Sequence, residues 1–171
     1  MTKQELEICI RDYGKDLYSF CCQLTGCTQE AEELYQDTFL TAVERREKIE
    51  YRENPKSYLL SIAIRIWKNR KRKLAWRRRI AEIIPMEDRE ILLQGNSSLP
   101  EEEMLEQEEI AWVHRAVANL PEGLKLVVLL YYMEELSIVQ IATTMEIPQG
   151  TVKSRLHRAK KMIKKELEEL L

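Results

Sequence analysis

The chain has 171 residues, of which 44 % are hydrophobic and 33 % are charged, and its formal net charge is −2. That length predicts one domain or two small ones, and the scarcity of Gly and Pro (five of each), without any alternating strand pattern, favours an all-α protein. The longest apolar run, Leu126–Met133, is shorter than the roughly 18 residues of a membrane span, and acids interrupt the N-terminal apolar stretches, so a cytoplasmic protein without a signal peptide is expected.

Apolar residues near the N-terminus recur at steps of three and four residues, which predicts a first amphipathic helix. The residues of this stripe are Leu6, Cys9, Ile10, Tyr13, Leu17, Phe20, Cys21 and Leu24. None of the spacings among the four cysteines, which include Cys22 and Cys27, matches a C-x2-C pair with a second ligand pair. Buried thiols are therefore favoured over metal or redox chemistry, and no metal or cofactor is expected.

A second helix is predicted to begin with Thr28 as its N-cap and to run to about Glu47. Acidic residues follow the cap, and they suit the positive end of the helix dipole. One face is expected to be buried and consists of Ala31, Leu34, Thr38 and Ala42. A different face carries acids, namely Glu30, Glu33, Asp37 and Glu44.

The stretch EYRENP, residues 50–55, predicts a loop, because a residue before proline avoids helical geometry. A long helix over about 55–80 follows, and its expected inward residues are Leu59, Ile62, Ala63 and Ile66. Residues 55–80 carry ten Lys and Arg and no acid, spread over roughly 39 Å of helix. Trp67 is interpreted as a core residue, whereas Trp76, beside Arg77–Arg79, is the better candidate for an exposed aromatic.

Residues 82–100 contain two prolines, a Gly-Asn-Ser-Ser cluster and little periodicity, which predicts a flexible acidic linker. The linker would separate a domain over residues 1–81 from a second over residues 101–171. In the second domain, one helix is expected to align Leu105, Ile110, Val113, Val117 and Leu120.

Pro121 is then predicted to occupy the first turn of the next helix. That helix, Leu124–Met133, is apolar nearly all round and is therefore expected to be central.

A short helix capped by Ser137, the turn EIP and a final helix rich in Lys and Arg together form a helix-turn-helix pattern. Ala142 is small where the two helices must cross, and Ile141, Val152 and Leu156 are apolar where the pair packs on its domain. The face left exposed carries Lys153, Ser154, His157 and Arg158 and is predicted to bind DNA. Glu146 occupies a turn position that usually holds glycine, at a cost of about 1 kcal/mol.

The charge is segregated along the chain. Residues 55–80 have a net charge of +10 and residues 146–171 of +3, whereas residues 1–54 have −5, residues 81–111 have −9 and residues 112–145 have −1. Two basic islands in an acidic chain indicate two separate contacts with a polyanion. The acidic balance limits non-specific attraction to DNA.

These features resemble those of bacterial RNA polymerase sigma factors of the extracytoplasmic-function (ECF) group. Their region 4 is similar to LPEGLKLVVLLYYMEELSIVQIATTMEIPQGTVKSRLHRAKKMI, residues 120–163, in which GTVKSRLHRA is the most typical part. Their region 2.2 resembles AEELYQDTFLTA, residues 31–42, and their regions 2.3 and 2.4 resemble NPKSYLLSIAIRIWKNRKRK, residues 54–73. The resemblance implies two small helical domains, sigma region 2 and sigma region 4, joined by the linker.

The resemblance also implies which residues bind promoter DNA. Region 4 would read the −35 element as duplex through Gln149, Thr151, Lys153, Ser154, His157 and Arg158. Region 2 would hold the opened −10 strand, with a base taken up by the loop at residues 51–54, through Tyr51, Arg52, Asn54, Arg65, Lys68, Asn69 and Arg72. The family usually has Asn in place of Arg65 and Asp in place of Asn69, so its −10 specificity is not inherited.

The implied protein partners are core RNA polymerase and an anti-sigma factor that holds the chain inactive until a stress signal arrives, in some cases at the membrane. Region 2.2 would dock on the clamp helices of the largest polymerase subunit through Glu33, Gln36, Asp37 and Phe39. No catalytic activity and no small-molecule substrate are expected. Two alternatives stay open: a conventional helix-turn-helix activator or repressor that binds a palindromic duplex, and a small RNA-binding or enzymatic protein.

Overall fold

The computed structural model describes residues 2–45, 47, 54–80 and 101–170. Every regular element within these ranges is a helix, which confirms the all-α expectation. The chain divides into two compact units, residues 1–90 and 91–171. The predicted linker over residues 82–100 lies outside the described residues, so the boundaries 1–81 and 101–171 stay predictions.

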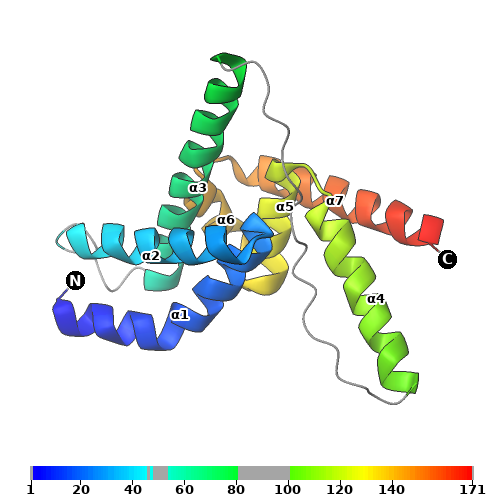
Figure 1. Ribbon diagram of the computed structural model, residues 1–171, viewed down its shortest axis with the longest axis horizontal. Helices are drawn as coiled ribbons and strands as arrows, with labels where there is room; N and C mark the ends of the chain where they lie inside the picture. Colours follow the sequence, from blue (N-terminus) through cyan, green and yellow to red (C-terminus); the bar gives the residue numbers. More distant parts are fainter. Residues whose placement is uncertain (1, 46, 48–53, 81–100, 171) are drawn as a thin grey trace. The chain divides into compact units, whose positions relative to one another are not determined.

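The first unit begins with α1, Lys3–Thr25, and α2, Thr28–Glu44 (Figure 1). A capping box starts α1, in which the Thr2 hydroxyl accepts the Glu5 N–H at 3.2 Å and the Glu5 carboxylate accepts the Thr2 N–H at 2.6 Å. Gly26 ends α1 with a left-handed φ of 68°, which glycine adopts without steric cost. The chain therefore turns directly from α1 into α2.

The predicted stripe of α1 contains one residue that the structure leaves exposed. Ile10 is exposed and Gly14 is buried, although the periodicity favoured Ile10. A Cβ atom on Gly14 would lie 3.0 Å from the hydroxyl oxygen of Tyr35, so Gly14 lies where the Tyr35 side chain of α2 packs closely on α1. Cys9 and Cys21 are buried as expected, and Cys22 is half-buried.

Helix α2 buries Ala31, Leu34, Thr38 and Ala42, as its periodicity predicts. The expected N-cap was wrong by one residue, because Cys27 occupies the cap in an extended conformation. The Thr25 hydroxyl, 3.4 Å from the Cys27 N–H, stabilises this turn. The helix also ends at Glu44, one turn before the predicted Glu47.

Helix α3, Pro55–Ile80, has the predicted bounds and packs on both α1 and α2. Asn54 precedes it with a left-handed φ of 69°, and its side-chain oxygen accepts the Ser57 N–H at 3.3 Å. The buried residues are Leu59, Leu60, Ile62, Ala63, Ile64 and Trp67, which confirms Trp67 as core, while Ile66 is half-buried. The C-terminal half of α3 extends past the α1–α2 pair (Figure 1).

The second unit consists of α4 (Glu101–Ala118), α5 (Glu122–Val128), the π-helical turn η2 (Leu129–Met133), α6 (Ile138–Met145) and α7 (Gln149–Leu170). As expected, α5 and the start of η2 supply the centre of the core, with Leu126, Val127 and Leu130 fully buried. Pro121 caps α5 instead of occupying its first turn. Helix α7 packs on α4, α5 and α6.

Helix α4 does not contain the whole predicted set, because it ends at Ala118 and Leu120 follows it. Ile110 is 57 % exposed and Val113 is 43 % exposed, whereas Ala116 and Leu120 are buried. Among residues 108–120, whose side chains are described, the buried ones lie toward the end, where Asn119 donates a hydrogen bond to Glu166 of α7 at 2.9 Å. The side chain of Leu105 lies outside the described part. None of the described helices combines the length and apolar character needed to span a membrane.

Candidate nucleic-acid interface

The helix-turn-helix is formed by α6, its turn and the start of α7. Ser137 caps α6 as predicted, because its hydroxyl accepts the Gln140 N–H at 3.2 Å while the Gln140 side chain accepts the Ser137 N–H at 2.9 Å. Glu146 has φ 56° and ψ 45°, so the residue in the glycine position does adopt the left-handed conformation. The Ile147 N–H donates to the Ala142 carbonyl at 3.0 Å and closes the turn.

The two faces of α7 separate as the sequence predicted. Val152, Leu156 and Ala159 are buried against the unit. Lys153, Ser154, His157 and Arg158 are all exposed on the opposite side, together with Gln149 at the start of the helix. Thr151 is half-buried, and its carbonyl accepts the Ser154 hydroxyl at 3.1 Å. The structure therefore brings the predicted −35 residues onto one surface.

The ion pairs of α7 lie in its C-terminal half. Lys164 and Lys165 are paired with Glu168 and Glu169 one turn later, at 3.6 and 3.7 Å. Within the described part of the chain, no ion pair involves Lys153 or Arg158. The N-terminal half, which a helix-turn-helix inserts into the major groove, thus presents Lys153 and Arg158 as cations outside these ion pairs.

Two further cations of α7 contact neighbouring helical elements of the second unit. The Lys160 ammonium lies 5.8 Å from the ring centre of Tyr132, and a hydrogen bond to that tyrosine raises the pKa of Lys160. The Arg155 guanidinium lies 3.3 Å from the place that a Cβ on Gly123 would occupy. Arg155 therefore packs on α5, and glycine at position 123 leaves room for it.

The second basic surface lies on α3. Arg65, Lys68, Asn69 and Arg72 are all exposed there, and Arg72 donates a hydrogen bond to the Asn69 side chain at 3.0 Å. The structure thus places these four predicted −10 residues side by side. Tyr51 and Arg52 lie outside the described residues. Asn54 is described, and its side-chain oxygen serves as the cap of α3.

The acidic face of α2 forms an ion pair with this basic helix. The Arg70 guanidinium donates a hydrogen bond to Asp37, and it lies 3.8 Å from a carboxylate oxygen of Glu33. Gln36 is exposed beside them. Phe39, the fourth predicted polymerase contact, is half-buried, with its ring edge-on to Tyr35 at 4.9 Å.

Leu40 is a residue of this face that sequence analysis missed. It follows Asp37 by three residues and Gln36 by four, so it shares their side of α2. Its side chain is 61 % exposed. The sequence did contain a sign of this exposed residue, because Leu40 is a large apolar residue among the polar positions of the predicted acidic face.

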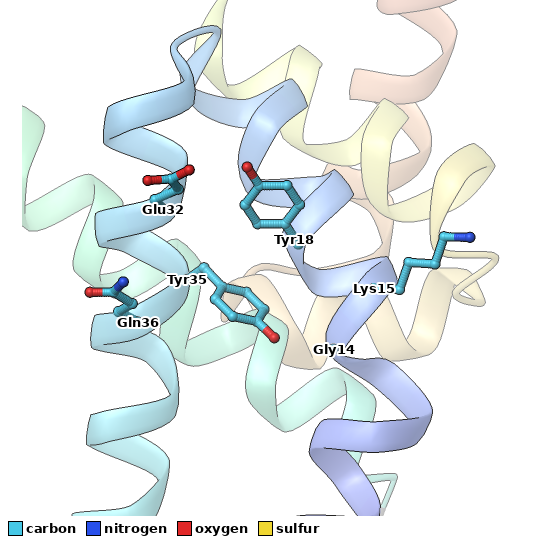
Figure 2. Close-up of a pocket in the computed structure, with 6 residues that line it drawn as sticks. All are labelled: Gly14, Lys15, Tyr18, Glu32, Tyr35 and Gln36. Carbon is cyan, nitrogen blue, oxygen red and sulfur yellow. The ribbon is translucent and has the colours of Figure 1, made fainter.

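A shallow pocket of about 360 Å³ lies between α1 and α2 (Figure 2). Tyr18 and Tyr35 meet there edge to face, with ring centres 5.6 Å apart. The neighbouring Cys22 thiol raises the pKa of Tyr18, and burial raises that of Tyr35. The ionic side chains of the lining, Lys15 and Glu32, point away from each other in Figure 2, so the pocket offers no paired acid and base.

No group of three metal-ligating side chains occurs within the described ranges.

Two family models match the chain in the order that the sequence patterns suggested. Residues 9–77 match the model described as Sigma-70 region 2, and residues 110–163 match the model described as Sigma-70, region 4. The first range contains the acidic face of α2 and the basic surface of α3. The second contains the helix-turn-helix.

Curated relatives cover nearly the whole chain. The RNA polymerase sigma-H factor of Pseudomonas aeruginosa is 31 % identical over 99 % of this chain and 89 % of its own length. The ECF RNA polymerase sigma factor SigW of Bacillus subtilis is 28 % identical over 92 % of this chain and 86 % of its own.

Solved structures share the fold. The sigma factor RpoE of Bartonella quintana, in complex with the anti-sigma factor NepR, aligns with a TM-score of 0.77 at 23 % identity, over 97 % of this chain and 96 % of its own. CnrH, in complex with the cytosolic domain of CnrY, aligns with a TM-score of 0.67 at 15 % identity, over 98 % of this chain and 90 % of its own.

Proposed function

The chain belongs to the extracytoplasmic-function group of sigma-70 RNA polymerase sigma factors, and we propose that it brings core RNA polymerase to promoters by contacting the −35 element with α7 and the −10 element with α3. The observation that carries this proposal is the placement of uncompensated cations on the recognition half of α7, combined with a second basic surface on α3. Two basic surfaces on two units match two separate promoter elements.

At the −35 element, Lys153, Ser154, His157 and Arg158 would face the major groove. Arg158 and Lys153 carry the donors that recognise guanine edges or phosphates. Gln149 and Thr151, at the start of the helix, are placed to contact the backbone, because the N-terminal end of a helix favours phosphate.

At the −10 element, the exposed row on α3 would hold the opened strand. Arg65, Lys68 and Arg72 supply charge for phosphates, and Asn69 supplies an amide for a base edge. The loop at residues 51–54 would contribute Tyr51 and Arg52 to this surface. The Tyr51 ring would stack on a flipped base. Asn54 would set the loop geometry through its cap of α3.

Core polymerase would bind the acidic face of α2. Gln36 and the carboxylates of Glu33 and Asp37, which Arg70 already contacts, present polar groups to that partner, and the exposed Leu40 adds an apolar contact at the middle of that face. Interfaces commonly combine an apolar centre with a polar rim. Phe39 would act indirectly, because its ring supports Tyr35 and is only half-exposed.

Control by an anti-sigma factor is part of the proposal. Its support is the fold shared with the sigma factor RpoE, whose solved structure contains the anti-sigma factor NepR. The chain would act in the cytoplasm, held inactive there or at the membrane through its partner, and it would add no catalytic step to the polymerase.

A transcription assay tests this function. The purified chain is mixed with core RNA polymerase and a library of promoter templates, and transcripts are sequenced. Initiation at a defined set of sites, dependent on the added chain, is the expected result. Binding of the chain alone to a palindromic duplex, without initiation, would instead identify a conventional helix-turn-helix regulator.

A further inference from the structure

Trp76 is an exposed aromatic on the part of α3 that leaves the core. It keeps 64 % of its surface exposed, whereas Trp67 on the same helix is buried. All residues from 72 to 80 are exposed, so this end of α3 contributes nothing to the core of its unit. A tryptophan in this place has no evident packing role.

The position of Trp76 on the helix continues the proposed −10 surface. Arg65, Asn69, Arg72 and Trp76 follow one another at steps of four, three and four residues, which places them in one row along the helix. The hydrogen bond from Arg72 to Asn69 shows that members of the row are in contact. Trp76 lies about 6 Å beyond Arg72 along the helix axis.

The surroundings of Trp76 are cationic. Its neighbours on the helix surface, three and four residues away, are Arg72, Lys73, Arg79 and Ile80. Three of these four carry positive charge, and α3 contains no acid at all. A flat aromatic ring among cations favours single-stranded nucleic acid, because phosphates bind the cations while a base stacks on the ring.

We propose that Trp76 is a stacking platform for an unpaired base of the opened promoter strand, and that it extends the −10 surface toward the end of α3. The proposal rests on the function proposed above. Leu74 offers a matched control, since it is also exposed, at 48 %. It follows Trp67 by seven residues, so it continues the buried stripe and points away from the row that contains Trp76.

The experiment uses holoenzyme reconstituted from core polymerase and the full chain. Its probe is a single-stranded oligonucleotide covering the −10 region of a promoter recovered in the transcription assay, with 2-aminopurine at each position in turn. The chain is compared as wild type, Trp76→Ala, Trp76→Tyr and Leu74→Ala. Affinity is measured over a series of salt concentrations.

Trp76→Ala is expected to weaken binding by about five- to 150-fold, the range for loss of one base–aromatic stack. The slope of log affinity against log salt should stay unchanged, because no charge is removed. Trp76→Tyr should restore most of the affinity, and Leu74→Ala should bind as wild type does. One 2-aminopurine position should be quenched by the wild type and not by Trp76→Ala.

Equal affinity of wild type and Trp76→Ala at every salt concentration would overturn the inference, as would equal losses from Trp76→Ala and Leu74→Ala. An affinity loss that Trp76→Tyr does not restore, without any change in 2-aminopurine quenching, would assign Trp76 to a protein contact instead. If wild-type holoenzyme initiates transcription at promoters while one of these results is found, the proposed function stands and only the role of Trp76 is refuted. Absence of initiation by the wild type would be a failure of the proposed function itself.

Discussion

Arg70 of α3 donates a hydrogen bond to Asp37 of α2, and its guanidinium also lies 3.8 Å from Glu33. The basic helix proposed to hold the −10 strand is thereby joined directly to the acidic face proposed to bind polymerase. Of the ten cations of α3, Arg70 is one that neutralises acids of its own unit instead of facing DNA.

The first prediction concerns the stability supplied by this pair. Arg70→Ala should lower the free energy of unfolding by roughly 0.2–1 kcal/mol, because the three charged groups are partly exposed and screened by water. The loss should shrink as salt is raised. Urea denaturation of the full chain measures it, with Arg72→Ala as control, since the partner of Arg72 within the described residues is the neutral Asn69 side chain. A loss that is the same at low and high salt would contradict an electrostatic origin.

The second prediction concerns the left-handed residue of the helix-turn-helix. Glu146→Gly should stabilise the second unit by about 1 kcal/mol, because glycine has no Cβ to clash at φ 56°. Gly26→Ala should do the reverse in the first unit, since Gly26 has φ 68°. Thermal unfolding of both variants measures whether each substitution raises or lowers the stability of the protein. A stability decrease for Glu146→Gly would mean that the strain at this turn has been overestimated.

The third prediction separates the two halves of α7. Arg158→Ala should weaken −35 binding by holoenzyme by about 1–3 kcal/mol and relax the preference for one base pair, as expected for a guanine contact. Lys165→Ala should have little effect, because Glu169 already neutralises that lysine. Competition binding with −35 variants measures both. Equal losses on every sequence would identify Arg158 as a phosphate contact.

The fourth prediction concerns Leu40. Leu40→Asp should leave the stability of the chain nearly unchanged, because the side chain is already in water, yet it should weaken core polymerase binding by at least about 1 kcal/mol. Ile10→Asp, on the exposed side of α1, is the control. Fluorescence anisotropy of the labelled chain against core polymerase measures the affinities. Equal affinities for the two variants would place the polymerase contact elsewhere.

The fifth prediction concerns the thiols of α1. Burial raises the pKa of Cys9 and of Cys22, so fewer thiolates are present at a given pH below that pKa than for a free cysteine. Alkylation by iodoacetamide at pH 8 should therefore be slower for both in the native chain than in urea, and it should speed up as the pH is raised. Peptide mapping by mass spectrometry gives the rates. Native rates equal to those in urea would show that α1 opens readily.

Much of the fold follows from local patterns in the sequence. Periodicity placed the buried residues of α2 and α7, the capping box of Ser137 is visible as a sequence motif, and Glu146 could be assigned to the left-handed turn from its place between two helices. Each of these features depends on residues only a few positions apart. The segregation of charge along the sequence located both basic surfaces, and the resemblance to a family then assigned each one a promoter element.

The features that the sequence did not predict depend on contacts with residues far away in the chain. An apolar stripe does not reveal where the neighbouring helix stops, so it could not show that Ile110 and Val113 are exposed. The close approach of the Tyr35 hydroxyl to Gly14 depends on how two helices pack, which the apolar stripe does not show. The Arg70–Asp37 pair spans 33 residues and has no local signal.

The central claim is that α3 and α7 select a promoter only when polymerase holds them. Band-shift titration on one promoter duplex and on a scrambled duplex tests it directly, with the chain alone and with holoenzyme. We expect weak binding without preference for the chain alone and strong preference for the promoter by holoenzyme. Equal promoter preference by the chain alone, or no complex between chain and core polymerase, would contradict the claim.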